Sequence, residues 1–192
     1  MAVIRRKIKR IVNIMETYKM KIAGLERELP LCKVNDNLKI AAFIIFGDVE
    51  ITVAAAKQLL EKCPEFDYIV CPEAKGIPLA YEMAKQSGKP YFICRKGPKV
   101  YMNNPVSVNV RSITTDKVQT VYLDGSEGEQ IRGKRVLIVD DVISTGESLA
   151  AVNELVNQFD SNIVGQAAVL AEGDAADRND IIFLERLPLF FE

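Results

Sequence analysis

The chain of 192 residues contains no histidine. This absence excludes Ser-His-Asp and Cys-His nucleophilic machinery, because both use imidazole as the general base. It also removes the commonest transition-metal ligand. Any chemistry must therefore rely on carboxylates, lysines, arginines, hydroxyls, backbone amides, or a metal bound through oxygen.

Cysteine is scarce, and no two of the four cysteines have C-x-x-C spacing, so zinc and redox motifs are not supported. Cys71 and Cys94 lie in apolar runs and are expected in the core. No signal peptide is recognised, so we expect free thiols at Cys32, Cys63 and both of these positions in a reducing cytoplasm. No apolar run approaches the roughly 18 residues that span a membrane, so no membrane contact is expected.

An excess of charge of either sign is also missing, because the formal net charge is −1. Nothing in this balance indicates a chain that coats nucleic acid, and we expect no nucleic-acid partner. The basic run at 5–10 is an exception. It could contact nucleic acid or an anionic surface, but so short a run is more often one solvated face of a helix.

Apolar spacing predicts a helix over residues 3–26. Residues 29–34 and 39–46 flank an Asn-Asp-Asn turn and are expected to form a hairpin. A helix is predicted over 52–63, where Pro64 follows it.

From residue 67 onward, apolar strands alternate with helices. Strands are predicted at 67–71, 90–94, 118–123, 135–139 and 163–171. Helices are predicted at 77–87 and 146–159. This order indicates an α/β fold with a parallel sheet covered by helices, and ligands of such sheets bind at the carboxyl ends of the strands. The polar stretch 95–117 is too long for an ordinary connection, which favours a lid or binding loop over a solvated excursion.

The strongest feature is the segment 136–148, which reads VLIVDDVISTGES. Asp140 and Asp141 follow a buried strand, and carboxylates accept hydrogen bonds from the vicinal hydroxyls of ribose. Amides at the start of the next helix, together with Ser144, Thr145 and Ser148 hydroxyls, suit a phosphate dianion. Acids at the end of a parallel strand and a Ser or Thr cap on the next helix are common. Acid pairs also hold Mg²⁺ in unrelated proteins. Only the whole thirteen-residue segment is therefore specific enough to indicate a function.

That string resembles the phosphoribosyl pyrophosphate (PRPP) motif of type I phosphoribosyltransferases. It lacks the spacing of a Walker A loop. The resemblance implies that Asp140 and Asp141 hold the ribose. It implies that the 5′-phosphate is bound by Ser144, Thr145, Gly146, Glu147 and Ser148.

Two further loops agree with this resemblance. The loop formed by Glu73, Ala74, Lys75 and Gly76 is similar to the pyrophosphate-binding loop of adenine enzymes, which carry Glu-Ala-Arg-Gly there. A lysine keeps the charge but loses the bidentate fork of arginine.

The second loop opens the polar stretch. Arg95, Lys96 and Lys99 resemble the entry to the catalytic loop of this family and are expected to act in catalysis. The adenine enzymes usually carry a Glu-Tyr pair later in this loop. The matching segment here, 112–116, lacks it, and Asp116 or Tyr101 could take that role.

The resemblance covers about residues 40–171. It implies a single type I phosphoribosyltransferase domain over 1–192, with a mostly parallel central sheet flanked by helices. A small hood subdomain would come from about 1–48 and 172–192, and the PRPP-binding core from about 49–171.

The base is the harder question. Glu172 follows the last predicted strand, and a carboxylate there could accept a hydrogen bond from the amino group of adenine. A solvent-facing glutamate is the simpler alternative. Phe46 and Asp48 resemble a Phe-x-Asp stretch that helps hold the base in adenine enzymes.

The implied reaction converts adenine and PRPP to AMP and pyrophosphate in purine salvage. Mg²⁺ is expected as the cofactor, held mainly by PRPP and water without a dedicated protein ligand. PRPP and a purine base are the expected partners, and a cytoplasmic homodimer is the expected form. The alternatives are a phosphoribosyltransferase for 6-oxopurines, a non-catalytic PRPP-sensing regulator that binds DNA, or an interaction module with a degenerate site.

Overall fold

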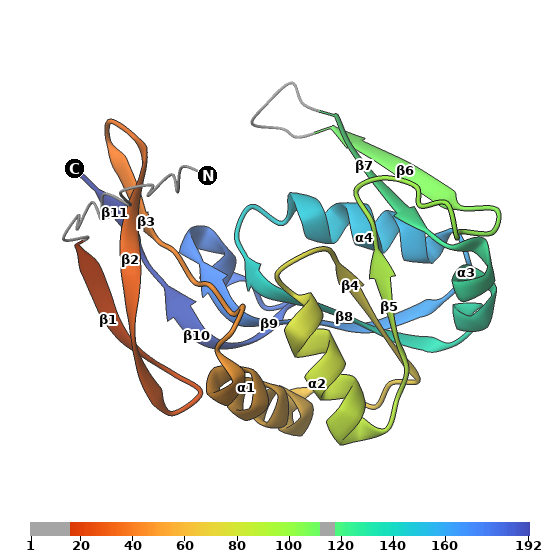
Figure 1. Cartoon of the computed structure of the whole chain (residues 1–192), viewed down its shortest axis with the longest axis horizontal. Helices are drawn as coiled ribbons and strands as arrows, with labels where there is room; N and C mark the ends of the chain where they lie inside the picture. The colour runs from red at the N-terminus through yellow and green to blue at the C-terminus, as the bar shows by residue number, and fades with distance from the viewer. Residues whose placement is uncertain (1–15, 112–117) are drawn as a thin grey trace, which may run out of the picture.

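The computed structural model describes residues 16–111 and 118–192. Within these residues the chain forms a five-stranded sheet, a four-stranded sheet and a two-stranded hairpin. The large sheet has the strand order β10-β9-β8-β4-β5, and every neighbouring pair in it is parallel (Figure 1). The predicted parallel α/β sheet is therefore confirmed.

The strands of the large sheet are β4 (Tyr68–Pro72), β5 (Tyr91–Cys94), β8 (Arg135–Ile143), β9 (Asn162–Glu172) and β10 (Ile182–Leu187). Its helices are α1 (Val49–Lys62), α2 (Ile77–Ser87), α3 (Gly125–Ile131) and α4 (Glu147–Asn157), with a 3₁₀ turn η1 (Gly173–Asp177) after β9. Helices α1 and α2 pack on one face, and α4 packs on the other (Figure 1).

Strand β8 shows why the sheet forms at its centre. Its side chains alternate between the two cores: Leu137 and Val139 face the α1–α2 side, whereas Val136 and Ile138 face the α4 side. All four are fully buried. A strand that is apolar on both faces belongs between two helical layers, and the central position of β8 follows from this pattern.

The smaller sheet combines β1 (Thr17–Ile22), β2 (Leu25–Asn35), β3 (Leu38–Ala41) and β11 (Leu189–Phe191). The prediction of a helix up to residue 26 is wrong for the described residues, and residues 3–15 lie outside them. Ala23 and Gly24 both have positive φ (49° and 86°), which makes a two-residue hairpin turn whose twist suits the flanking strands. Alanine rarely adopts this conformation, so the sequence carries little sign of the turn.

The predicted hairpin around 35–37 is confirmed, although β3 ends at Ala41 rather than at residue 46. Helix α1 begins at Val49, earlier than predicted, because the Asp48 side chain accepts a hydrogen bond from the Ile51 amide and caps it. The C-terminal strand β11 pairs with β3, so the two ends of the described chain meet in one sheet.

Part of the predicted loop 95–117 is a strand. β6 (Val106–Arg111) pairs with β7 (Val118–Leu123) along its whole length, and Val106 and Val108, two residues apart, both contact the α4-side core. After β7, Asp124 caps α3 and accepts hydrogen bonds from the amide and the hydroxyl of Ser126. No helix among the described residues has the length and apolar character needed to cross a membrane.

Candidate functional site

The site begins with the two carboxylates near the end of β8. Asp141 is buried, whereas Asp140 is partly buried and accepts a hydrogen bond from the Asp141 amide at 2.8 Å. Burial, and next the neighbouring Asp141 charge, hold the pKa of Asp140 well above its usual range. Two acids are thus held together where a parallel sheet binds its ligands.

The loop after β8 encloses a small cavity of about 50 Å³. All five predicted phosphate-binding residues line it, together with Asp140. Gly146 has φ of +80° and stands at the start of α4, where a residue with a side chain would be strained. Backbone amides at such a helix start bind anions, so the cavity suits a phosphate.

The loop after β4 turns back onto the carboxylates. The Lys75 Nζ atom lies 2.6 Å from Oδ2 of Asp141. A Cβ atom on Gly76 would lie 2.8 Å from Cys71 Sγ and 2.9 Å from Asp140 Oδ1, so only glycine allows this approach. The predicted pyrophosphate loop and the predicted ribose acids therefore form one cluster.

Glu73 points to the loop after β5. Its carboxylate accepts hydrogen bonds from the Lys96 amide at 2.6 Å and from Arg95 Nη1 at 3.1 Å. Arg95 also donates to the Tyr101 hydroxyl at 3.0 Å. Glu73 thus orients the entry to the loop, while the side chains of Lys96 and Lys99 are exposed.

A second hollow of about 290 Å³ lies where the small sheet meets the carboxyl edge of the large one. Lys75, Ser144 and Glu172 supply its polar lining. Glu172 is partly buried, and burial raises the pKa of its carboxyl, while the charge of Lys75 lowers it. The apolar wall comes from Ile40, Ala41, Ala42, Phe43, Ile44, Val142 and Leu187.

Phe46 and Asp48 do not line this hollow. Phe46 is 52% exposed, and Asp48 accepts two hydrogen bonds from Arg27, at 2.7 and 3.0 Å. The segment 40–44 falls within the predicted hood, 1–48, but the sequence singled out none of its residues as a wall, because the apolar run was assigned to a strand. Its place in the pocket depends on the end of β3 at Ala41.

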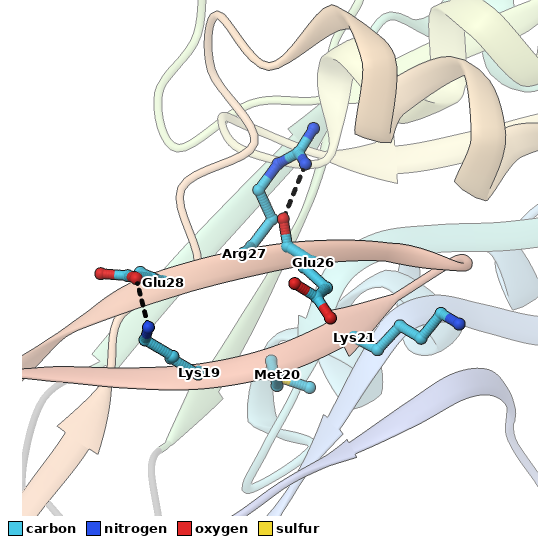
Figure 2. A pocket seen from close by; sticks show the side chains of 6 residues that line it. All are labelled: Lys19, Met20, Lys21, Glu26, Arg27 and Glu28. Atoms are coloured by element: carbon cyan, nitrogen blue, oxygen red, sulfur yellow. Dashed lines mark hydrogen bonds and ion pairs between the residues drawn. The ribbon is translucent and has the colours of Figure 1, made fainter.

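A larger hollow, of about 530 Å³, lies on the β1–β2 hairpin, and Figure 2 shows the six residues that line it: Lys19, Met20, Lys21, Glu26, Arg27 and Glu28. Its charges partly satisfy one another, since Lys19 pairs with Glu28 at 3.0 Å. None of these residues comes from a loop at the carboxyl end of a parallel strand. We therefore place the functional site at the two smaller hollows.

An acid pair at the end of a parallel strand, a glycine-opened helix behind it and a lysine loop in front form one cluster at the carboxyl edge of the parallel sheet. Residues 49–186 match the family described as phosphoribosyl transferase domain. The chain belongs to this family, and its fold is that of the type I phosphoribosyltransferases.

Curated relatives include two kinds of protein. The purine biosynthesis transcriptional repressor PurR of Bacillus subtilis is 34% identical over 113 residues, which cover 59% of this chain and 39% of PurR. The hypoxanthine/guanine phosphoribosyltransferase of Methanothermus fervidus is 33% identical over 110 residues, 57% of this chain and 54% of that protein. The chain therefore spans about half the length of these relatives, or less.

Similar solved structures include the adenine phosphoribosyltransferase of Thermoanaerobacter pseudethanolicus. It has a TM-score of 0.68 and 19% identity, and the match covers 82% of this chain and 95% of that one. The adenine phosphoribosyltransferase of Saccharomyces cerevisiae has a TM-score of 0.61 and 22% identity, with coverage of 88% and 93%. At these identities the likeness shows the fold alone.

Proposed function

We propose that the chain is a Mg²⁺-dependent purine phosphoribosyltransferase that converts adenine and PRPP to AMP and pyrophosphate in purine salvage. The observation that carries the proposal is the cluster of Asp140, Asp141 and Lys75 between two adjoining hollows. The smaller one suits a 5′-phosphate, and the larger one has room for a purine. Ser144 lines both, so one substrate can extend from phosphate to base.

In the proposed reaction a purine nitrogen attacks the anomeric carbon of PRPP. The bond from that carbon to the pyrophosphate oxygen breaks as the new C–N bond forms, and pyrophosphate leaves with the bonding electrons. The transition state has oxocarbenium character. Asp140 and Asp141 accept hydrogen bonds from the ribose hydroxyls, and the loop 144–148 fixes the phosphate end.

Cationic groups around the leaving pyrophosphate lower the barrier by stabilising its developing charge. Lys75 stands on one side of the ribose acids, and the loop with Arg95, Lys96 and Lys99 follows the neighbouring strand β5. Glu73 contributes indirectly by holding Arg95. Closure of the loop that begins at Arg95 would exclude water, which otherwise hydrolyses PRPP. The predicted segment 112–117, with Asp116, lies outside the described residues.

Mg²⁺ fits this site as an ion that arrives with the substrate. The described residues hold no group of three or more metal-ligating side chains, but the Asp140–Asp141 pair can bind waters of an ion that is held mainly by PRPP oxygens. The ion would supply charge neutralisation on the pyrophosphate. Asp141 also has Lys75 as a cationic partner, which limits the charge that it offers to a metal.

Glu172 supports adenine as the base. It lines the larger hollow, and an ionised carboxylate accepts from an amino group but repels a 6-oxo oxygen. The sequence likeness to a hypoxanthine/guanine enzyme keeps the 6-oxopurines as the competing substrate class. The small sheet, which closes the far side of this hollow, would act as the hood.

A PRPP-sensing regulator is the second candidate, because PurR of Bacillus subtilis is among the relatives above 30% identity. Such a protein would bind PRPP and DNA without turnover. Binding of duplex DNA at low salt, lost as salt rises, would support it.

The test is a panel assay with PRPP, Mg²⁺ and one base per tube: adenine, hypoxanthine, guanine or xanthine. AMP formed from adenine alone supports the proposal, and turnover of a 6-oxopurine instead overturns the base assignment. No turnover with PRPP binding moves the protein to the regulator class. Asp141→Asn is expected to lower kcat/KM at least about tenfold, roughly 1.4 kcal/mol, and an unchanged value would contradict the ribose assignment.

We also propose that the chain is a homodimer that forms through α1 and α2. Val49, Val53 and Tyr81 are 71%, 41% and 55% exposed and border one shallow hollow. Exposed apolar groups gathered in this way mark interfaces. Glu50 on α1 already pairs with Arg27 of its own chain at 2.7 Å, so the exposed apolar groups carry this proposal.

The compartment that we propose for the reaction is the cytoplasm. All four cysteines are free in the structure, as expected, and Cys71 and Cys94 are buried. Burial raises the pKa of the Cys94 thiol to about 12, so it stays protonated and unreactive.

A further inference from the structure

The segment after β9 reaches the phosphate loop from the side. Strands β8 and β9 are parallel neighbours, so the loops that follow them lie side by side (Figure 1). In the η1 segment, Ala175 and Ala176 are buried, and Ile181 follows after a short connection. These three residues share one buried cluster with Ile143 and Leu149, which flank the phosphate loop. The two loops are therefore held against each other by packing.

Arg178 is the charged residue in this packed segment. Its Nε and Nη2 atoms donate to the two oxygens of Asp180 at 2.8 and 2.7 Å. This fork fixes the plane of the guanidinium, and the side chain is 34% exposed. The hydrogen bonds of Arg178 leave its third nitrogen, Nη1, without a hydrogen bond to any residue within 16–109 and 120–192.

Nη1 faces the phosphate loop. It lies 2.8 Å from the position that a Cβ atom would take on Gly146, so the guanidinium rests against the glycine that opens α4. Gly146 itself lines the small cavity. The guanidinium is a fixed cation, and only Gly146 separates it from the anion site. Such a cation is suited to strengthen binding of a phosphate dianion.

We propose that Arg178 is a positioning residue of the 5′-phosphate subsite, and that Asp180 orients it for that task. The inference rests on the proposed function, because it requires that the loop 144–148 binds the phosphate end of PRPP. Arg178 does not itself line the cavity, so what it supplies is positive charge behind Gly146, from outside the motif that carries the resemblance. Glycine at position 146 is required by its φ of +80°, and the open side of this glycine is where the guanidinium approaches.

The experiment measures the affinity of the full chain for two probes, ribose 5-phosphate and pyrophosphate, by isothermal titration calorimetry. Arg178→Gln is expected to weaken binding of ribose 5-phosphate by about tenfold, because the cation beside the phosphate loop is lost, and to change binding of pyrophosphate by less than about twofold. Asp180→Asn keeps the Arg178 cation but removes the carboxylate that orients it. A smaller loss of affinity for ribose 5-phosphate is therefore expected. Arg178→Lys is expected to recover part of the affinity.

The matched control is Arg186→Gln. Arg186 is another arginine of the C-terminal segment, paired with Asp177 at 2.7 Å and 65% exposed, and it should affect neither probe. Thermal unfolding of each variant confirms that the fold is kept. In the enzymatic assay, Arg178→Gln should raise KM for PRPP while kcat changes little, a split that general loss of structure would not produce.

The outcomes separate the inference from the function beneath it. If wild type binds ribose 5-phosphate and Arg178→Gln binds it equally well, the role of Arg178 is refuted and the function stands. Equal losses for both probes also refute it, because Arg178 would then act on the whole site or on pyrophosphate. If wild type binds neither probe, the phosphate site itself is wrong, and this inference fails with it.

Discussion

The Lys75 ammonium lies 2.6 Å from the Asp141 carboxylate, and this contact joins the loop after β4 to strand β8 across 66 residues of the chain. The lysine side chain is 47% exposed, whereas that of Asp141 is 5% exposed. A buried carboxylate needs such a partner, because an unpaired charge is costly away from water. Under the proposed function, PRPP would bind beside this contact, and Lys75 would influence both the acids and the entry of the substrate.

Lys75→Gln is therefore expected to lower kcat/KM by about tenfold or more. Lys75 also lowers the pKa of Asp140 and of Glu172, although burial dominates both shifts. Without the lysine both pKa values rise, and the acid limb of the pH–rate profile should move to higher pH. Lys85→Gln, an exposed lysine on α2, is the control. An acid limb that stays in place would show that Lys75 does not act on these acids.

The stability of the substrate-free protein should depend on the protonation of Asp140. Burial and the Asp141 charge raise the pKa of Asp140 to about 8. Between about pH 4 and pH 8, Asp140 is therefore protonated in the folded chain and ionised in the unfolded chain. The contribution of Asp140 to the free energy of unfolding falls as pH rises through this range. Asp140→Asn removes this loss and should melt at least about 2–4 °C above wild type at pH 8.

The same variant should differ less from wild type at pH 5, where less of the penalty has accumulated. Calorimetric or fluorescence melts at the two pH values measure the gap. Asp36→Asn, in the exposed turn between β2 and β3, is the control and should show no such trend. A gap of equal size at both pH values would contradict the raised pKa.

Asp48 distinguishes a structural role from base binding. It caps α1 and accepts two hydrogen bonds from Arg27, so Asp48→Ala should lower the free energy of unfolding by about 0.5–2 kcal/mol through the lost cap alone. Asp48→Asn keeps a capping oxygen and should cost less. Denaturant titration measures both. Since Asp48 does not line the hollow, Asp48→Asn should keep the wild-type kcat/KM for adenine; a large loss would restore a role in base binding.

The proposed interface on α1 and α2 has a direct test. Val53→Asp places a charge at the centre of the surface and should convert a dimer to a monomer, as measured by sedimentation velocity. Val34→Asp makes the same change at an exposed valine of β2 and should leave the oligomeric state unaltered. A wild-type monomer, or a dimer that survives Val53→Asp, would show that this surface is not the interface.

Local sequence patterns determined the parallel core of the fold. The continuous apolar run of β8, the acids at its end and the small residues before α4 all act within one stretch of chain. Because parallel strands end at one edge of the sheet, the loops at 73–76, 95–99 and 140–148 could be expected to converge without any coordinates. The structure brings them together as expected, and the family match agrees.

Tertiary structure decided what depends on distant contacts or on weak local signals. Residues 17–22 form a strand because they pair with β2 across an Ala-Gly turn, and their apolar spacing suited a helix equally well. The bonds of Asp48 with Arg27 and of Lys75 with Asp141, and the approach of Arg178 to Gly146, join segments 21 to 66 residues apart. Such contacts arise only when separate elements pack, because the chain that links them carries no periodic record of which side chains will meet.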